Sequence, residues 1–113
     1  GHERVVDLLL QHGAEISLQD SVGATALMHA ASYGHERVVD LLLRHGAEVN
    51  LQDSDGGTAL IYGAGNGHER VVGLLIRFGA ELNLQDSVCG TAMMRAASQG
   101  HERLVDLLIR RGA

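Results

Sequence analysis

The feature that most constrains the fold is an internal repeat with a period of 33 residues. The stretch GHERVVDLLL at residues 1–10 returns unchanged at 34–43, and it returns with small changes at 67–76 and 100–109. A unit this short can cover its apolar face only by stacking on its neighbours. The repeat therefore predicts an elongated array of like units rather than a closed globule.

Each unit contains two helical patterns separated by a polar loop. Residues 36–45 predict an amphipathic helix, and Gly46 follows at a position suited to a left-handed cap. The polar segment that comes next contains Gly56 and predicts a hairpin-like turn. Thr58 then precedes a shorter run at 59–66, whose first turn its hydroxyl can cap. The unit is predicted to be helix, loop, helix, with the two helices packed antiparallel.

These residues resemble the ankyrin repeat family. The resemblance is carried by the GxTxL pattern of Gly23 to Leu27, the Ala30-Ala31 pair followed by Gly34-His35, the VVxLLL core, and GAEVN at 46–50. It covers the whole chain and implies an all-α solenoid of stacked antiparallel helix pairs with β-hairpin-like loops. Residues 1–113 are then one domain. It divides into the second helix of a partial repeat at 1–14 and full repeats at 15–47, 48–80 and 81–113.

The chain departs from the family pattern at one turn position. Cys89 stands where the other units have Gly23 and Gly56. A left-handed turn favours glycine, because a side chain there is strained. The substitution puts the left-handed geometry of this turn in question, unless Gly90 shifts to provide it.

Composition excludes several classes of function. The formal net charge is −5 and lysine is absent, so the basic stripe that binds phosphate backbones is missing and nucleic acid is not expected as a partner. No apolar run is long enough to span a membrane. A single cysteine favours a reducing, intracellular environment, and we expect the cytoplasm. No grouping of residues indicates catalysis or a cofactor, so the chain is expected to be non-enzymatic.

Positions that differ among the units are candidates for contact with a partner. By resemblance they fall on the hairpin tips and the concave face, where ankyrin repeats usually bind another protein. Tyrosine and arginine are also enriched among residues that dominate interface affinity. The competing interpretation is drift on an unused surface. The predicted partner-binding residues are Val22, His29, Tyr33, Asp55, Tyr62, Asn66, Val88, Arg95 and Gln99.

Two further recurring residue types have a functional and a structural interpretation. His2, His35, His68 and His101 occur once per unit, too far apart to share one metal ion, so we expect them to begin the long helices and bond local backbone. By resemblance, Asn50 and Asn83 are candidate sites of hydroxylation. Their ordinary role is to hydrogen-bond the loop backbone.

The leading hypothesis is a protein-binding scaffold, and two alternatives stay open. In one, molecules associate end to end, with the apolar helix at 1–14 of one molecule stacked on the last unit of another. In the other, the near-identity of the units reflects a designed or recently duplicated sequence without a natural target.

Overall fold

The structure is a computed structural model that describes residues 16–112. Within these residues there are six helices and no strand. The predicted helix at 1–14 lies outside the described residues. The helices are α2 (Ala26–Tyr33), α3 (Glu36–Arg44), α4 (Ala59–Gly65), α5 (Glu69–Arg77), α6 (Ala92–Ser98) and α7 (Glu102–Arg110).

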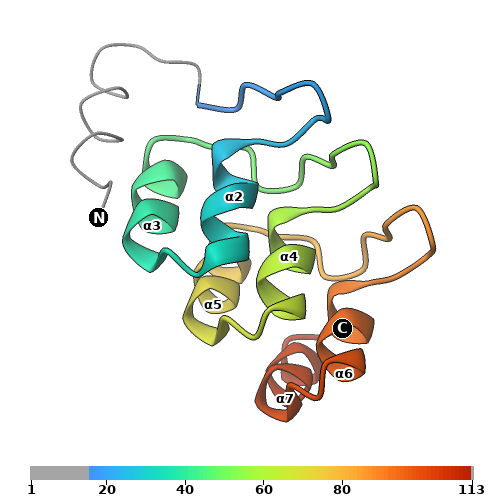
Figure 1. Ribbon diagram of the computed structural model, residues 1–113. Helices are drawn as coiled ribbons and strands as arrows, with labels where there is room; N and C mark the ends of the chain where they lie inside the picture. The colour runs from blue at the N-terminus through green and yellow to red at the C-terminus, as the bar shows by residue number, and fades with distance from the viewer. Residues whose placement is uncertain (1–15, 113) are drawn as a thin grey trace.

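The helices form two stacked layers. The short helices α2, α4 and α6 contact one another in order, and each also contacts the long helix that follows it in the chain. The loops project from the helices in one common direction (Figure 1). The described chain measures 39 × 25 × 21 Å, so it extends along the stacking axis. This arrangement confirms the predicted all-α repeat fold.

The short helices begin where the sequence predicted. The hydroxyl of Thr58 accepts a hydrogen bond of 3.1 Å from the backbone N–H of Ile61 and so caps the first turn of α4. Thr25 and Thr91 do the same at α2 and α6. After the long helix α3, Gly46 has a φ of 91°, the left-handed conformation expected of it. Local sequence therefore determines where these helices start and stop.

The core lies between successive units. Leu27 and Leu60 of the short helices are each 1 % exposed, and Leu75 of α5 is fully buried. Ala31, Ala64 and Ala96 are also fully buried, and their small side chains let the stacked short helices approach closely. Most of the apolar area of each unit is thus covered by its neighbours, as expected for an array.

Two of the histidines that precede long helices, His68 and His101, bond to the preceding unit. His68 Nε2 lies 3.0 Å from the carbonyl oxygen of Ser32, and His101 Nε2 lies 3.2 Å from that of Gly65. A Cβ atom added to Gly34 would lie 2.6 Å from the ring of His68, so this glycine makes room for the bond. The prediction of local backbone bonds was wrong: neither side chain caps its own helix. These histidines instead hold adjacent repeats together.

The middle of the array is expected to have the lowest local stability. Gly63, Gly65 and Gly73 lie inside α4 and α5, and glycine in a helix costs about 0.5–1 kcal/mol relative to alanine. Amide hydrogen exchange should therefore be faster at residues 58–76 than at the equivalent residues 25–43. Gly73→Ala should slow exchange in α5, since the added methyl group meets no atom within 4 Å apart from the adjacent residues and the backbone of α5 itself. Equal protection of the two stretches would contradict this expectation.

Candidate partner-binding surface

One aspartate organises each hairpin. Asp53 Oδ1 accepts hydrogen bonds from the backbone N–H groups of Asp55 and Gly57, at 3.0 and 2.9 Å. Asp20 and Asp86 accept the equivalent pairs in the other hairpins. A backbone bond from Ser54 to Val22 O then joins the first hairpin to the second. Each loop is folded around a carboxylate, and neighbouring loops are bonded to each other.

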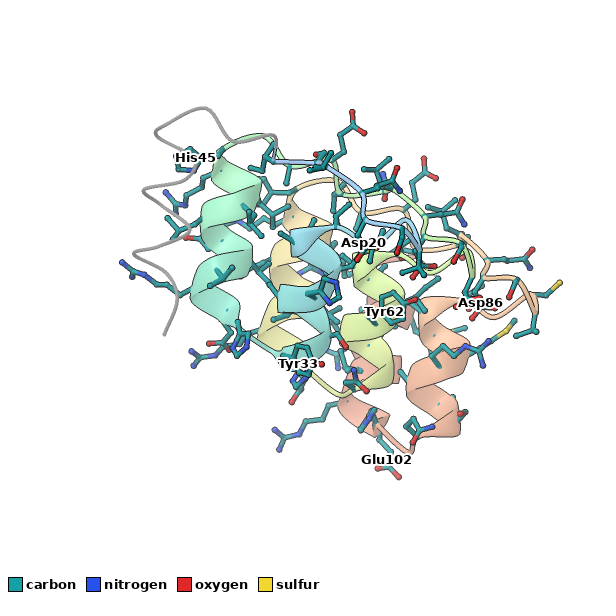
Figure 2. The ribbon with its side chains drawn as sticks, turned by 45° about the horizontal axis from the view of Figure 1, so that its top comes forward. Asp20, Tyr33, His45, Tyr62, Asp86 and Glu102 are labelled. Atoms are coloured by element: carbon teal, nitrogen blue, oxygen red, sulfur yellow. The ribbon has the colours of Figure 1, made fainter. Side chains whose placement is uncertain are left out.

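The second oxygen of each aspartate faces the short helix of the same unit. Tyr62 donates its hydroxyl to Asp53 Oδ2. Arg95 donates to Asp86 Oδ2 through Nε at 2.9 Å and Nη2 at 2.5 Å. His29 Nε2 lies farther from Asp20 Oδ2, at 3.7 Å. At this position of the repeat each unit has a different side chain. In every unit, however, that side chain is directed at the aspartate of its own hairpin. Figure 2 shows Asp20, Tyr62 and Asp86 on the side of the molecule where the hairpins lie.

A second variable position lies beside these side chains, and it is glycine in the two units where the side chain comes closest to the aspartate. Gly57 lies under Tyr62, and a Cβ atom at Gly57 would come within 2.5 Å of the Tyr62 hydroxyl. A Cβ atom at Gly90 would likewise lie 2.6 Å from Cζ of Arg95. The first unit has alanine at this position, Ala24, and there the histidine stays at the longer distance. In the second and third full units, the residues at these two variable positions therefore lie in direct contact.

Hydrogen bonding shifts the pKa values of these groups. The backbone N–H of Gly90, followed by the guanidinium of Arg95, lowers the pKa of Asp86 below its ordinary value. The backbone N–H groups of Ala24 and Val22 lower the pKa of Asp20. Partial burial, followed by the bond to Asp53, raises the pKa of Tyr62 above its ordinary value. Asp20 and Asp86 are therefore ionised and Tyr62 is protonated at neutral pH.

A shallow hollow lies between α4 and α6. It has a volume of about 330 Å³ and is lined by Tyr62, Asn66, Arg95 and Gln99, together with Asp86. Asn66 is held at its edge by bonds of 3.0 and 3.1 Å from Nδ2 to the carbonyl and hydroxyl oxygens of Ser32. Four of the nine residues predicted to bind a partner are thus brought together. The hollow offers both hydrogen-bond donors and acceptors.

The other predicted residues do not line this hollow. Val22 and Val88 stand at hairpin tips and are 55 % and 73 % exposed, and Asp55 is exposed at the tip between them. Tyr33 is 71 % exposed at the end of α2, and His29 is exposed on the same helix. Apolar side chains at the hairpin tips provide surface that a partner can cover.

The structure also settles the geometry of the substituted turn. Cys89 itself has a φ of 64°, whereas Gly90 is not left-handed. The suggestion that Gly90 takes over this role was wrong. Gly56 packs closely on the backbone of the next hairpin. A Cβ atom added to Gly56 would lie 2.9 Å from Cα of Asp86. Cys89 is exposed, so its side chain meets no such neighbour among the described residues.

Cys89→Gly should stabilise the protein by about 0.5–1 kcal/mol. Glycine removes the strain of a left-handed side chain, about 1–2 kcal/mol, but adds conformational entropy to the unfolded chain. Urea denaturation monitored by circular dichroism measures the difference. Val88→Gly is the matched control, because Val88 lacks a positive φ and should gain nothing. No gain for Cys89→Gly would mean that this turn carries no strain.

Raising the pH above 10 should destabilise the protein in part through Tyr62. The folded state raises the pKa of this phenol above the ordinary 10.0, so the unfolded chain loses the proton first. The contribution of Tyr62 is complete below pH 10 and declines as the pH rises beyond it. Comparing urea denaturation at pH 9 and pH 11 should show a smaller loss for Tyr62→Phe than for the wild type. Tyr33→Phe, which removes an exposed hydroxyl, should behave as the wild type does.

The two asparagines differ in their surroundings. Asn50 Nδ2 donates to Gly79 O at 3.2 Å, and Asn50 Oδ1 accepts from the N–H of Glu81 at 2.8 Å. Both ends of this amide therefore bond the loop of the following unit. Asn83 is exposed, and its side chain makes no hydrogen bond within residues 16–112.

Neither a metal centre nor a membrane span is found in the described part of the chain. No three histidine, cysteine or acidic side chains there are grouped so that they can hold a metal ion. None of the helices α2 to α7 is long and apolar enough to cross a membrane.

Comparison with known proteins agrees with the stacked helix pairs and the hairpins between them. The family model for ankyrin repeats (3 copies) matches residues 1–86, and a second model for ankyrin repeats (many copies) matches residues 66–109. The chain belongs to the ankyrin repeat family. A search of curated proteins found no match. Ankyrin repeats generally mediate interactions between proteins and are typically not enzymes.

Proposed function

We propose that this chain is a non-enzymatic scaffold that binds a partner protein through its hairpin tips and the concave hollow. The observation that carries the proposal is the hollow between α4 and α6, in which Tyr62, Asn66, Arg95 and Gln99 converge. Tyr62 and Arg95 are held in place by aspartates, so little side-chain entropy is lost when a partner binds. Preorganised aromatic and arginine side chains are the ones that most often dominate affinity.

The hollow favours a polar segment flanked by apolar residues. Arg95 is about one-third exposed although it is bonded to Asp86, so part of its guanidinium is free to bond a partner's acceptor. Asp55 adds a negative charge at the neighbouring hairpin tip, while Val22 and Val88 offer apolar contacts. We propose that this mixture of charges selects the partner, and that the tips add buried apolar area.

Affinity capture with matched variants tests the proposal. Tyr33→Ala/Gln99→Ala changes two exposed concave residues that make no side-chain hydrogen bond in the described structure. Arg103→Ala/Arg111→Ala changes two exposed residues of the long-helix side and serves as the control. Proteins bound from a cell extract are quantified by mass spectrometry. A set of proteins lost with the first variant and retained with the second supports the proposal, and equal recovery with both refutes it.

A second candidate function is self-association through the last described repeat. Val105 and Ile109 border a hollow of about 420 Å³ on α7, and Ile109 is 56 % exposed. The same side of the inner repeats is covered by the next unit. We propose that a further repeat-like surface, such as another copy of the chain, can stack there. Sedimentation velocity over a range of concentrations should show a dimer that Ile109→Arg abolishes; a monomer at every concentration excludes it.

We also propose a site of modification and a cellular location. Asn83 is the better of the two candidate asparagines, because its amide is exposed whereas that of Asn50 bonds the next loop. An intracellular, cytoplasmic location is proposed from the single cysteine.

A further inference from the structure

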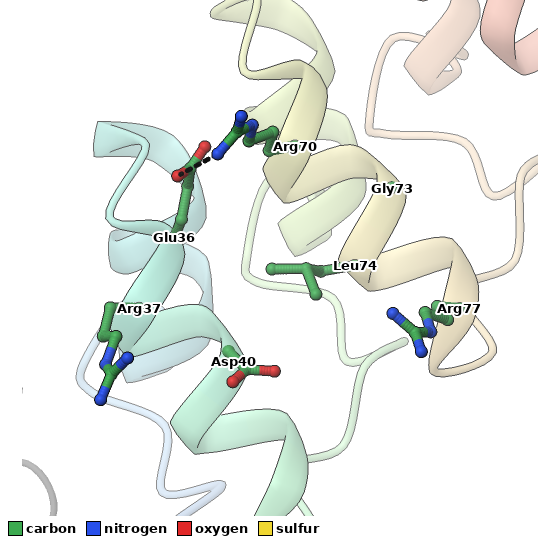
Figure 3. A pocket seen from close by; sticks show the side chains of 7 residues that line it. All are labelled: Glu36, Arg37, Asp40, Arg70, Gly73, Leu74 and Arg77. Carbon is green, nitrogen blue, oxygen red and sulfur yellow. Dashed lines mark ion pairs between the residues drawn. The ribbon is translucent and has the colours of Figure 1, made fainter.

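A groove lies between the long helices α3 and α5, in the layer that does not carry the concave hollow. Its volume is about 480 Å³. Glu36 and Asp40 form the wall on α3, while Arg70, Gly73, Leu74 and Arg77 lie on α5 (Figure 3). Leu74 is directed into the space between the helices, and the guanidinium of Arg77 faces the same space from the end of α5. The groove therefore combines an apolar centre with charged walls.

The groove is lined at the one position where the middle unit lacks an acidic residue that the neighbouring units have. Position 73 is glycine, whereas the equivalent residues are Asp40 and Asp106. Those aspartates form ion pairs with the arginine four residues later: Asp40 with Arg44 at 3.0 Å and Asp106 with Arg110 at 3.2 Å. Arg77 is the corresponding arginine of α5, and among the described residues no carboxylate lies within ion-pair distance of it. The repeat thus leaves a guanidinium without the carboxylate that its counterparts have.

The space beside Arg77 is open and the local charge is unbalanced. Apart from the adjacent residues and the backbone of α5 itself, a Cβ atom added to Gly73 would meet no atom within 4 Å. Both carboxylate oxygens of Asp40 already accept from Nε of Arg44, at 3.0 Å each, which commits this charge to its own helix. Glu36 is 3.9 Å from Arg70, a long contact between exposed side chains. A positive site therefore remains next to Leu74 on a chain whose net charge is −5.

We propose that this groove binds a segment of a partner protein that presents a glutamate side chain beside a leucine-like apolar residue. The glutamate carboxylate takes the place left by the missing aspartate and accepts hydrogen bonds from the guanidinium of Arg77. The apolar neighbour packs on Leu74. The groove and the concave hollow share no residue, so this site does not depend on the function proposed above.

Titration with a minimal peptide tests the site. The probe is acetyl-Leu-Glu-Leu-amide, and acetyl-Leu-Gln-Leu-amide is its uncharged counterpart. Each is added at millimolar concentration to the ¹⁵N-labelled chain, and amide shifts are followed by NMR. We expect the glutamate peptide to shift the resonances of α3 and α5, and the glutamine peptide to bind about tenfold more weakly.

Variants at the vacant position separate binding from folding. Gly73→Asp restores the pair with Arg77 and should weaken binding of the glutamate peptide by about tenfold while raising the melting temperature, since it also removes a helix glycine. Gly73→Ala should stabilise the helix and keep the binding. Arg77→Gln should lose the binding, and Arg110→Gln, its equivalent on α7, should keep it. Equal affinity for Gly73→Asp and the wild type, equal binding of the two peptides, or no shift in α3 and α5 would overturn the proposal.

Discussion

Replacing Leu60 with alanine should lower the free energy of unfolding by about 3 kcal/mol, within the range measured when a buried leucine is truncated. Leu60 is 1 % exposed in α4, the short helix that contacts both α2 and α6. The cavity would therefore weaken two interfaces between repeats at once. Urea denaturation followed by circular dichroism measures the loss.

Leu18→Ala is the matched control for this prediction. Leu18 is 67 % exposed in the loop before α2, so its truncation should change stability by about 0.5 kcal/mol or less. If Leu60→Ala cost no more than Leu18→Ala, the burial of α4 between its neighbours would not be what holds the array together.

Gly56→Ala should destabilise the protein by about 2 kcal/mol or more. The left-handed conformation of Gly56, with a φ of 73°, costs a residue with a side chain about 1–2 kcal/mol. The new methyl group would also lie 2.9 Å from Cα and 3.0 Å from C of Asp86, so the next hairpin must move. Because Asp86 binds Arg95, we expect the hollow to be disturbed as well. Thermal and urea denaturation measure the loss of stability.

Gly46→Ala separates the cost of the left-handed backbone from the cost of the clash with the next hairpin. Gly46 is also left-handed, with a φ of 91°, but an added Cβ atom would have no neighbour within 4 Å. It should cost only the conformational part, about 1–2 kcal/mol. Equal losses at Gly46 and Gly56 would show that contact between successive hairpins is unimportant for stability.

The fold could be predicted from the sequence because local signals and the period agree. Thr58 marks a helix start, Gly46 a helix end, and the 33-residue register places like apolar faces against each other. What the sequence did not reveal are bonds that cross from one unit to the next. The link from His68 to Ser32 O spans 36 residues, and no local pattern at either residue points to the other.

The candidate surface was predicted in part. Comparison among units identified Tyr62 and Arg95 as variable, but it gave no sign that both bind an invariant aspartate. Because only positions that differ among the units were candidates for the surface, the invariant Asp53 and Asp86 were not among them. The sequence did contain a sign of this contact. Glycine replaces alanine at positions 57 and 90, in the two units whose short helix carries tyrosine or arginine.

The proposed function assigns stability and partner recognition to different side chains. Invariant groups, such as the Asp86 carboxylate and the His68 ring, bond the backbone of their own hairpin or of the preceding repeat. Variable side chains are supported by those groups and face the hollow. A substitution among the variable residues is therefore expected to alter what is bound more than whether the chain folds.

The most direct test is the hydrogen-exchange footprint of a captured partner on the chain. If the account is correct, the partner should slow amide exchange in the hairpin tips around residues 22, 55 and 88 and in the short helices α4 and α6. The backbone of α7 should exchange as it does in the free protein. Protection confined to the long helices, with the hairpins and the hollow unaffected, would contradict it.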